Sequence, residues 1–249
     1  IIFASIVSQL PAQFGGAYQV TAGQGRIGQF SFLMLMFFLM IVGIIYVEQG
    51  QRRIPIQFAK RVRGRKVMGG QSTYIPLKVN SAGVIPVIFA TSILFFPALV
   101  ATSLPQDNSV TAAIRNWIDV NLANSQGTTW FYIFFLGILI IFFTYFYTTI
   151  QFDPVRQSDM IRRQGGFIPG VRPGISTTNY LSHILNRITL PGSIFLASVA
   201  VLPSIASAIW DIPLGFSGIS ILITVGVALE TMKQIESQLS MRNYEGFID

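Results

Sequence analysis

The stretch EQGQRRIPIQFAKRVRGRKVMGGQSTYIPLKVN, residues 48–80, lies between two long uncharged runs of apolar residues. Against the single acid Glu48 it holds eight cationic side chains, a net charge of +7: Arg52, Arg53, Lys60, Arg61, Arg63, Arg65, Lys66 and Lys78. Lysine and arginine near the ends of membrane spans are retained on the cytoplasmic side. The stretch therefore predicts a cytoplasmic loop, residues 48–79, and sets the orientation of every other segment.

Two segments of this loop have the composition of β-strands. Residues 54–62 and 66–77 carry β-branched and aromatic side chains on either side of Arg63, Gly64 and Arg65, which predicts a two-stranded hairpin. An isolated hairpin is marginally stable in water, so one with this charge is expected to meet an anionic partner. The alternative is a solvated basic loop with no partner, which the positive-inside rule alone would favour.

The composition indicates an integral membrane protein. Hydrophobic residues make up 51% of the chain and charged residues 11%, with a mean hydropathy of +0.58. A soluble domain has about 25% charged residues. The chain has no cysteine and only one histidine, His183, which excludes disulfides, thiolate chemistry and cysteine or histidine metal clusters. We predict no metal site and no cofactor.

The uncharged runs predict an all-α polytopic membrane helix bundle, with the basic β-hairpin as its main cytoplasmic loop. Five complete spans are expected, at residues 27–47, 80–103, 130–150, 188–210 and 213–230. Residues 1–10 are apolar and stop at Pro11, too short for the ~20 residues that a helical span needs. Because they begin without an initiator methionine, we expect a partial span and a fragment of a longer protein.

The segments between the spans agree with one alternating topology. Residues 11–29 are expected to form an outer loop, and residues 104–128, with net charge −1, another. In the second of these, four apolar residues at helical spacing predict a short interfacial helix: Ile114, Trp117, Ile118 and Leu122. Residues 151–187, with net charge +3, and the tail 231–249 are expected in the cytoplasm.

The centre of the second cytoplasmic loop reads GGFIPGVRPG, residues 165–174. Four glycines and two prolines in ten residues exclude a helix and predict a stiff set of turns, with Arg172 held at the tip. Residues 176–179 offer capping side chains for a helix that would begin at Tyr180.

No Asp, Glu, Lys, Arg or His lies in the middle of any predicted span. Ion-coupled transporters and intramembrane hydrolases usually bury such groups, so a passive conduit or scaffold is favoured and no enzyme is predicted. Two alternatives remain. A solute transporter built from inverted repeats would need an intramembrane charge or polar cluster, and an intramembrane enzyme would need a Ser/His, paired-Asp or metal constellation.

Four motifs closely resemble the SecY family, the channel subunits of the bacterial-type Sec protein translocon, and occur in the family's order. They are YVEQGQRRIPIQFAKR (46–61), GGQSTYIPLKVNSAGVIPVIFA (69–90), GGFIPGVRPG (165–174) and TMKQIESQLSMRNYEGF (231–247). The resemblance covers nearly all of residues 1–249. It implies the second half of a ten-span protein, from the end of the fifth span, and thus one half of an inverted-repeat clamshell around an hourglass pore.

The resemblance implies three sets of site residues. A ring of apolar side chains that seals the pore would include Ile2, Ile88 and Ile223, although an ordinary buried or lipid-facing isoleucine is the alternative for each. One side of a lateral gate would include Pro86, Thr91 and Ser92. Contacts with the ribosome or the SecA motor would use these positions on the cytoplasmic loops and tail: Arg65, Lys66, Arg172 and Tyr244.

The resemblance also implies a function and partners. The channel would move unfolded preproteins across the membrane and release membrane-protein helices laterally into it. Its partners would be the SecE and SecG subunits, ribosomal RNA phosphates, SecA, the translocating polypeptide and membrane lipids. The expected location is the bacterial plasma membrane, with a thylakoid membrane as the alternative. The plug and the opposite gate helices would belong to the first half.

Overall fold

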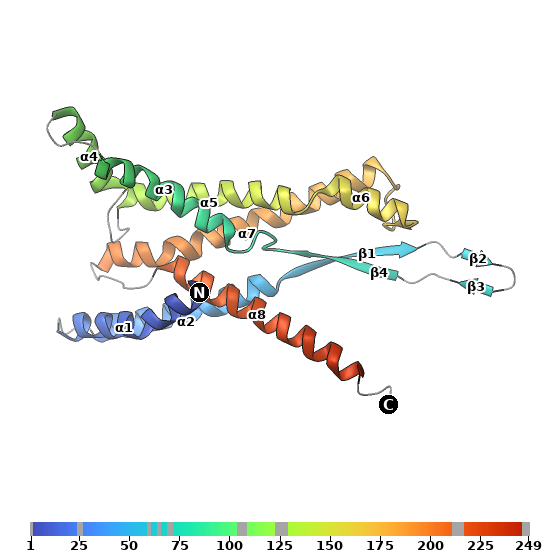
Figure 1. Ribbon diagram of the computed structural model, residues 1–249, viewed down its shortest axis with the longest axis horizontal. Coiled ribbons are helices and arrows are strands. Elements are labelled where there is room, and N and C mark those ends of the chain that lie inside the picture. The colour runs from blue at the N-terminus through green and yellow to red at the C-terminus, as the bar shows by residue number, and fades with distance from the viewer. Residues whose placement is uncertain are drawn as a thin grey trace.

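The computed structural model describes residues 2–23, 27–58, 61–63, 66–68, 72–103, 109–122, 129–210 and 217–245 (Figure 1). Its helices are α1 (Ile2–Gly23), α2 (Ile27–Gln49), α3 (Ile85–Ser103), α4 (Ser109–Asn121), α5 (Trp130–Gln151), α6 (Pro154–Arg163), α7 (Ile175–Trp210) and α8 (Gly218–Glu245). Its strands are β1 (Gln51–Phe58), β2 (Arg61–Arg63), β3 (Lys66–Met68), β4 (Ser72–Lys78) and β5 (Gly166–Phe167). The helical fold class expected from the sequence is confirmed.

Five helices in the described part of the chain are long and apolar enough to cross a membrane, namely α2, α3, α5, α7 and α8. Each overlaps one of the five predicted spans. Helix α7 has 36 residues, and at 1.5 Å per residue it is longer than the ~30 Å hydrocarbon core requires. Its first residues therefore continue the span into the predicted cytoplasmic loop, as the last residues of α8 continue into the predicted tail.

The prediction that the first apolar segment stops at Pro11 and leads into an outer loop is wrong, because α1 runs through Pro11 to Gly23. The proline removes one backbone hydrogen bond, but packing against α2 supports the helix beyond it. The ring of Phe14 lies edge-on to Phe37 of α2, with centroids 5.0 Å apart. Further along, Thr21 is buried, and its hydroxyl donates a hydrogen bond to the carbonyl of Ala17.

The spans pack into one apolar core, to which α2, α3, α5, α7 and α8 all contribute buried side chains. Helix α7 runs between the pair α3 and α5 on one side and α1 and α2 on the other (Figure 1). It contacts α2, α5 and α8 directly. Helix α7 is thus the central element of the bundle.

The β-hairpin predicted from the sequence is confirmed. Strands β1 and β4 pair antiparallel from Gln51↔Lys78 to Gln57↔Ser72, and the shorter β2 and β3 pair between Arg61↔Met68 and Arg63↔Lys66. Strand β5 adds to β1, which the sequence did not predict, and completes a sheet of order β4-β1-β5.

The hairpin, α6 and the C-terminal end of α8 extend from the same end of the bundle, and α4 lies at the opposite end (Figure 1). This arrangement agrees with the alternating topology that the loop charges predict. Helix α4 is the short helix predicted between two spans, and its Trp117 is exposed with the ring 5.6 Å from that of Phe131.

Candidate functional site

The three-stranded sheet is held against α6 and α7 by an apolar cluster. In β1, Ile54 and Ile56 point inward and are buried, whereas Arg53 and Pro55 point outward. The cluster consists of Ile54, Ile56, Leu77, Ile161, Ile168, Leu181 and Ile184. On the outer face the guanidinium of Arg53 lies 4.9 Å from the ring centre of Tyr74. A hairpin that would be marginal alone is therefore stabilised by burying one of its faces.

Gly166 lets β5 approach both β1 and α6. A Cβ atom added there would lie 3.0 Å from Cγ2 of Ile56, 3.1 Å from the ring of Phe58 and 3.2 Å from Cγ2 of Ile161. Any larger residue would require these neighbouring side chains to move by a few tenths of an ångström. Glycine thus permits this close approach without such a shift.

The turn of residues 168–174 has a defined main chain around an exposed Arg172 side chain. The amide of Val171 donates to the carbonyl of Ile168 at 3.0 Å, and Gly170 (φ +83°) and Gly174 (φ +114°) adopt left-handed conformations. Ile168 is buried in the apolar cluster and Val171 packs against it. The prediction of a turn with Arg172 at its surface is confirmed.

The expectation of a helix that begins at Tyr180, with residues 176–179 as its cap, is wrong. Helix α7 begins at Ile175, and the amides of Thr177 and Thr178 donate to the carbonyl of Gly174 at 3.0 and 3.2 Å. The left-handed Gly174 lets the turn lead directly into the helix, so these residues form its first turn.

Helix α6 was not predicted, although the sequence contained its signal. Asp153 precedes Pro154, and its carboxylate accepts hydrogen bonds from the amides of Val155 and Arg156 at 2.9 and 3.4 Å. An acidic N-cap followed by proline is a strong start signal for a helix.

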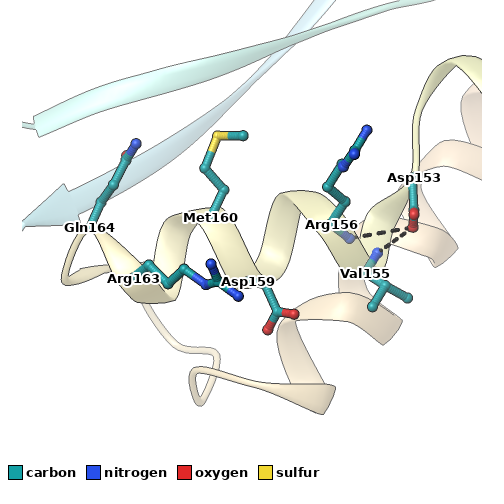
Figure 2. A pocket seen from close by; sticks show the side chains of 7 residues that line it. All are labelled: Asp153, Val155, Arg156, Asp159, Met160, Arg163 and Gln164. Atoms are coloured by element: carbon teal, nitrogen blue, oxygen red, sulfur yellow. Dashed lines mark hydrogen bonds between the residues drawn. The ribbon is translucent and has the colours of Figure 1, made fainter.

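A groove of about 600 Å³ runs along α6, lined by Asp153, Val155, Arg156, Asp159, Met160, Arg163 and Gln164 (Figure 2). Arg156, Met160 and Gln164 project from one side of the helix and Asp159 from the other (Figure 2). The carboxylate of Asp159 lies 3.8 Å from the guanidinium of Arg162.

Asn80 joins the end of α2 to the start of α3. It is 5% exposed, and its Nδ2 donates to Oε2 of Glu48 at 2.9 Å and to the carbonyl of Gly83 at 3.2 Å. Both Asn80 and Glu48 line a cavity of about 240 Å³ that also contacts Lys233 of α8. The base of the hairpin is thereby connected to the loop that leads into α3.

The predicted lateral-gate residues lie on the first half of α3. Pro86 is buried in the first turn, Thr91 is half-buried and Ser92 is exposed. The hydroxyls of Thr91 and Ser92 donate to the carbonyl of Ile88 at 2.9 and 2.8 Å. These side chains are therefore satisfied within their own helix.

Of the predicted ring residues, Ile88 on α3 is 39% exposed and Ile223 on α8 is half-buried. Val84, immediately before α3, approaches Gly226 of α8, where an added Cβ on the glycine would lie 3.2 Å from Cγ1 of Val84. Ile88 follows Val84 by four residues and Ile223 precedes Gly226 by three residues, about 6 and 4.5 Å along a helix axis, and both lie away from the end of the bundle that carries the hairpin. The two isoleucines thus lie at similar distances from this contact.

The other predicted site residues have limited description. Ile2, Lys66 and Tyr244 belong to α1, β3 and α8, but their side chains lie outside the described part of the chain. Arg65, between β2 and β3, lies outside the described residues altogether. Among the residues that are described, no group of three His, Cys, Asp or Glu side chains could hold a metal ion.

Comparisons with known proteins identify relatives along the whole chain. A family model described as SecY matches residues 1–232. The protein translocase subunit SecY of Streptomyces scabiei is 47% identical over 254 residues, covering 100% of this chain and 56% of that protein. The SecY subunit of Mycobacterium leprae is 46% identical over 257 residues, covering 100% and 57% respectively. The chain spans about half the length of these curated relatives.

Solved structures share the fold. One concerns the plug domain of a SecY protein, which stabilises the closed state of the translocation channel and maintains a membrane seal; its TM-score is 0.59 at 17% identity, over 95% of this chain and 58% of that one. Another, described as a protein conducting channel, has a TM-score of 0.50 at 15% identity, over 90% and 53%. At this identity the likeness concerns the fold alone.

Proposed function

Since this chain belongs to the SecY family, we propose that it forms the second half of a protein-conducting channel in the bacterial plasma membrane. The channel moves unfolded preproteins across the membrane and releases membrane-protein helices laterally into it. The observation that carries this proposal is the match of the SecY model to residues 1–232. The proposed role of the chain is to form a passage for polypeptides and not to catalyse a reaction.

We propose that Ile2, Ile88 and Ile223 contribute to an apolar ring that seals the pore. The similar distances of Ile88 and Ile223 from the contact between Val84 and Gly226 support this assignment. The partial exposure of both side chains also supports it, because a residue that lines a channel is not fully covered by the half of the channel to which it belongs. An apolar constriction excludes water and ions by dewetting, yet forms no specific bond that would hold a passing polypeptide.

We assign the side of a lateral gate to Pro86, Thr91 and Ser92 on α3. The hydroxyls of Thr91 and Ser92 bond to the carbonyl of Ile88, so α3 can face lipid there without an unsatisfied donor. This suits a helix that alternates between contact with the other half and contact with lipid.

The cytoplasmic docking surface is proposed to include Arg65, Lys66, Arg172 and Tyr244, with the ribosome or SecA as partner. The hairpin and the Arg172 turn are parts of one packed unit and carry many cations. Arginine forks bind phosphate without reading bases, as a ribosomal RNA surface requires. SecE and SecG are the proposed partners within the membrane.

Site-specific crosslinking tests the proposed pore. In the full-length protein, Ile88→Cys should crosslink to a secretory chain stalled during translocation. This chain contains no other cysteine, so the introduced thiol is unique within it. Leu39→Cys on α2, where the native side chain is 67% exposed, is the matched control and should give no crosslink. Equal labelling of the two, or none at position 88, would refute the placement of Ile88 in the passage.

Arg172→Lys should reduce translocation while membrane insertion stays normal. Lysine keeps the charge but lacks the planar fork that binds two anionic oxygens at once. The turn holds the main chain at Arg172 in one place, so a flexible ammonium cannot recover the lost geometry. Protein import into membrane vesicles measures the effect, with Arg163→Lys on α6 as the control for a conservative change at an exposed arginine. Normal import by Arg172→Lys would mean that charge alone matters.

A further inference from the structure

Two hydroxyl groups donate hydrogen bonds to the main chain of the Arg172 turn. Oγ1 of Thr177, in the first turn of α7, donates to the carbonyl of Arg172 at 3.0 Å. Oγ of Ser158, on α6, donates to the carbonyl of Gly174 at 3.1 Å. Both residues are only 3% exposed, although the turn that they contact is at the surface. The turn is therefore hydrogen-bonded to two different helices, α6 and α7.

These contacts remove most of the freedom of the main chain around Arg172. The carbonyls that they fix belong to the residues on either side of Pro173, whose ring already restricts φ to about −65°. On the other side of Arg172, the amide of Val171 is bonded to the carbonyl of Ile168 at 3.0 Å. The side-chain torsions of Arg172 remain free, whereas the direction of its Cα–Cβ bond is restricted by the main chain on both sides.

Water could satisfy the carbonyl of Arg172 if direction did not matter, and the carbonyl of Gly174 already accepts from the amides of Thr177 and Thr178. The two hydroxyls are buried polar groups, and each would be costly if left without an acceptor. The turn and the two helices therefore hold one another in a single arrangement, and loss of either hydroxyl should release the turn before it unfolds the helices.

We infer that Thr177 and Ser158 are positioning residues that fix the direction in which the Arg172 guanidinium meets an anionic partner. The inference rests on the proposed docking role of Arg172. An arginine fork binds phosphate through two parallel hydrogen bonds, so its affinity depends on the direction of approach. A turn that moves freely must be ordered again each time the partner binds.

The test uses the full-length protein, reconstituted with its membrane partners in lipid nanodiscs, and purified bacterial ribosomes as the probe. Affinity is measured by fluorescence titration at one fixed salt concentration. Thr177→Val, which removes the hydroxyl and keeps the branched shape, should weaken binding about two- to tenfold. Thr177→Ser restores the hydroxyl and should restore the affinity. Ser158→Ala, on the other helix, should weaken binding in the same range.

A double-substitution cycle separates positioning from general stability. If Thr177 acts through Arg172, then Thr177→Val should cause no further loss in protein that already carries Arg172→Ala. An equal loss with and without Arg172 would overturn the inference, because the hydroxyl would then support the fold as a whole. The midpoint of thermal unfolding, measured on the same samples, should be unchanged by Ser158→Ala.

The outcomes for the two proposals differ. If Arg172→Ala weakens binding while Thr177→Val and Ser158→Ala bind as the natural protein does, the positioning inference fails and the docking role stands. If Arg172→Ala itself binds normally, the docking role of Arg172 fails, and the inference with it.

Discussion

Replacing Gly218 with leucine should disrupt the packing of α8 against α7 and prevent the spans from assembling into their native bundle. A Cβ atom added at Gly218 would collide with the main-chain carbonyl of Val199 and lie 3.0 Å from Cα of Ala200. These are backbone atoms in the middle of α7 and cannot rotate away as a side chain can. Overpacking costs about 1–3 kcal/mol for a few methylenes, and a clash with backbone should reach or exceed the upper end.

The midpoint of thermal unfolding and the resistance to protease of the full-length protein in nanodiscs would measure this effect. Ala228→Leu is the matched control, because Ala228 is exposed on the same helix ten residues later. Gly192 of α7 should behave like Gly218, since its added Cβ would lie 2.7 Å from the carbonyl oxygen of Val79. If Gly218→Leu unfolds at the same temperature as Ala228→Leu, the close approach of the two helices is not required.

The spans and the hairpin could be predicted because the residue patterns that produce them are local in the sequence. Long uncharged runs identify the membrane-spanning helices, and alternation in β1 places Ile54 and Ile56 on one face. The ends of the helices could not be predicted in the same way. Charges mark where the membrane ends, but the hydrogen-bond ladders of α7 and α8 continue beyond that boundary.

Pro11 and β5 show what local rules miss. Proline is a helix breaker by local propensity, yet α1 continues because Phe14 and the residues after it pack against α2. Strand β5 has only two residues and exists because Gln57 and Phe58 are placed beside it by the fold. Both outcomes depend on partners that are distant in the sequence or belong to another helix.

The candidate site likewise has one part that the sequence predicts and another that it does not. The glycines and prolines of residues 165–174 are sufficient to predict a stiff turn with Arg172 exposed. Nothing in the sequence indicates that Ser158 and Thr177 bond to that turn, because a hydroxyl has no preferred partner until the tertiary structure brings one within reach. Likewise, the sequence shows only that Glu48 is an acidic residue. In the structure its carboxylate accepts a hydrogen bond from the buried Asn80.

Changing Ile88 and Ile223 together to serine in the full-length protein should make the resting channel leak ions while secretory proteins still cross. A narrow apolar constriction stays dry, whereas hydroxyl groups hold water there and let ions pass. The two residues lie at similar distances from the contact between Val84 and Gly226, so the double change should alter one level of the proposed passage. Transport should continue because an apolar ring makes no specific bond to the polypeptide.

Conductance across a planar bilayer measures the leak, and import into vesicles measures transport in the same preparation. A control with equal loss of apolar surface replaces Ile93 and Ile209 with serine, since these side chains are 45% and 63% exposed on α3 and α7. Ile93 is five residues from Ile88, which at 100° per residue turns it well away from the same face of α3. If the control leaks as much as the Ile88 and Ile223 pair, the effect is general loosening of the bundle. If neither leaks, the two isoleucines pack the interior and the seal lies elsewhere.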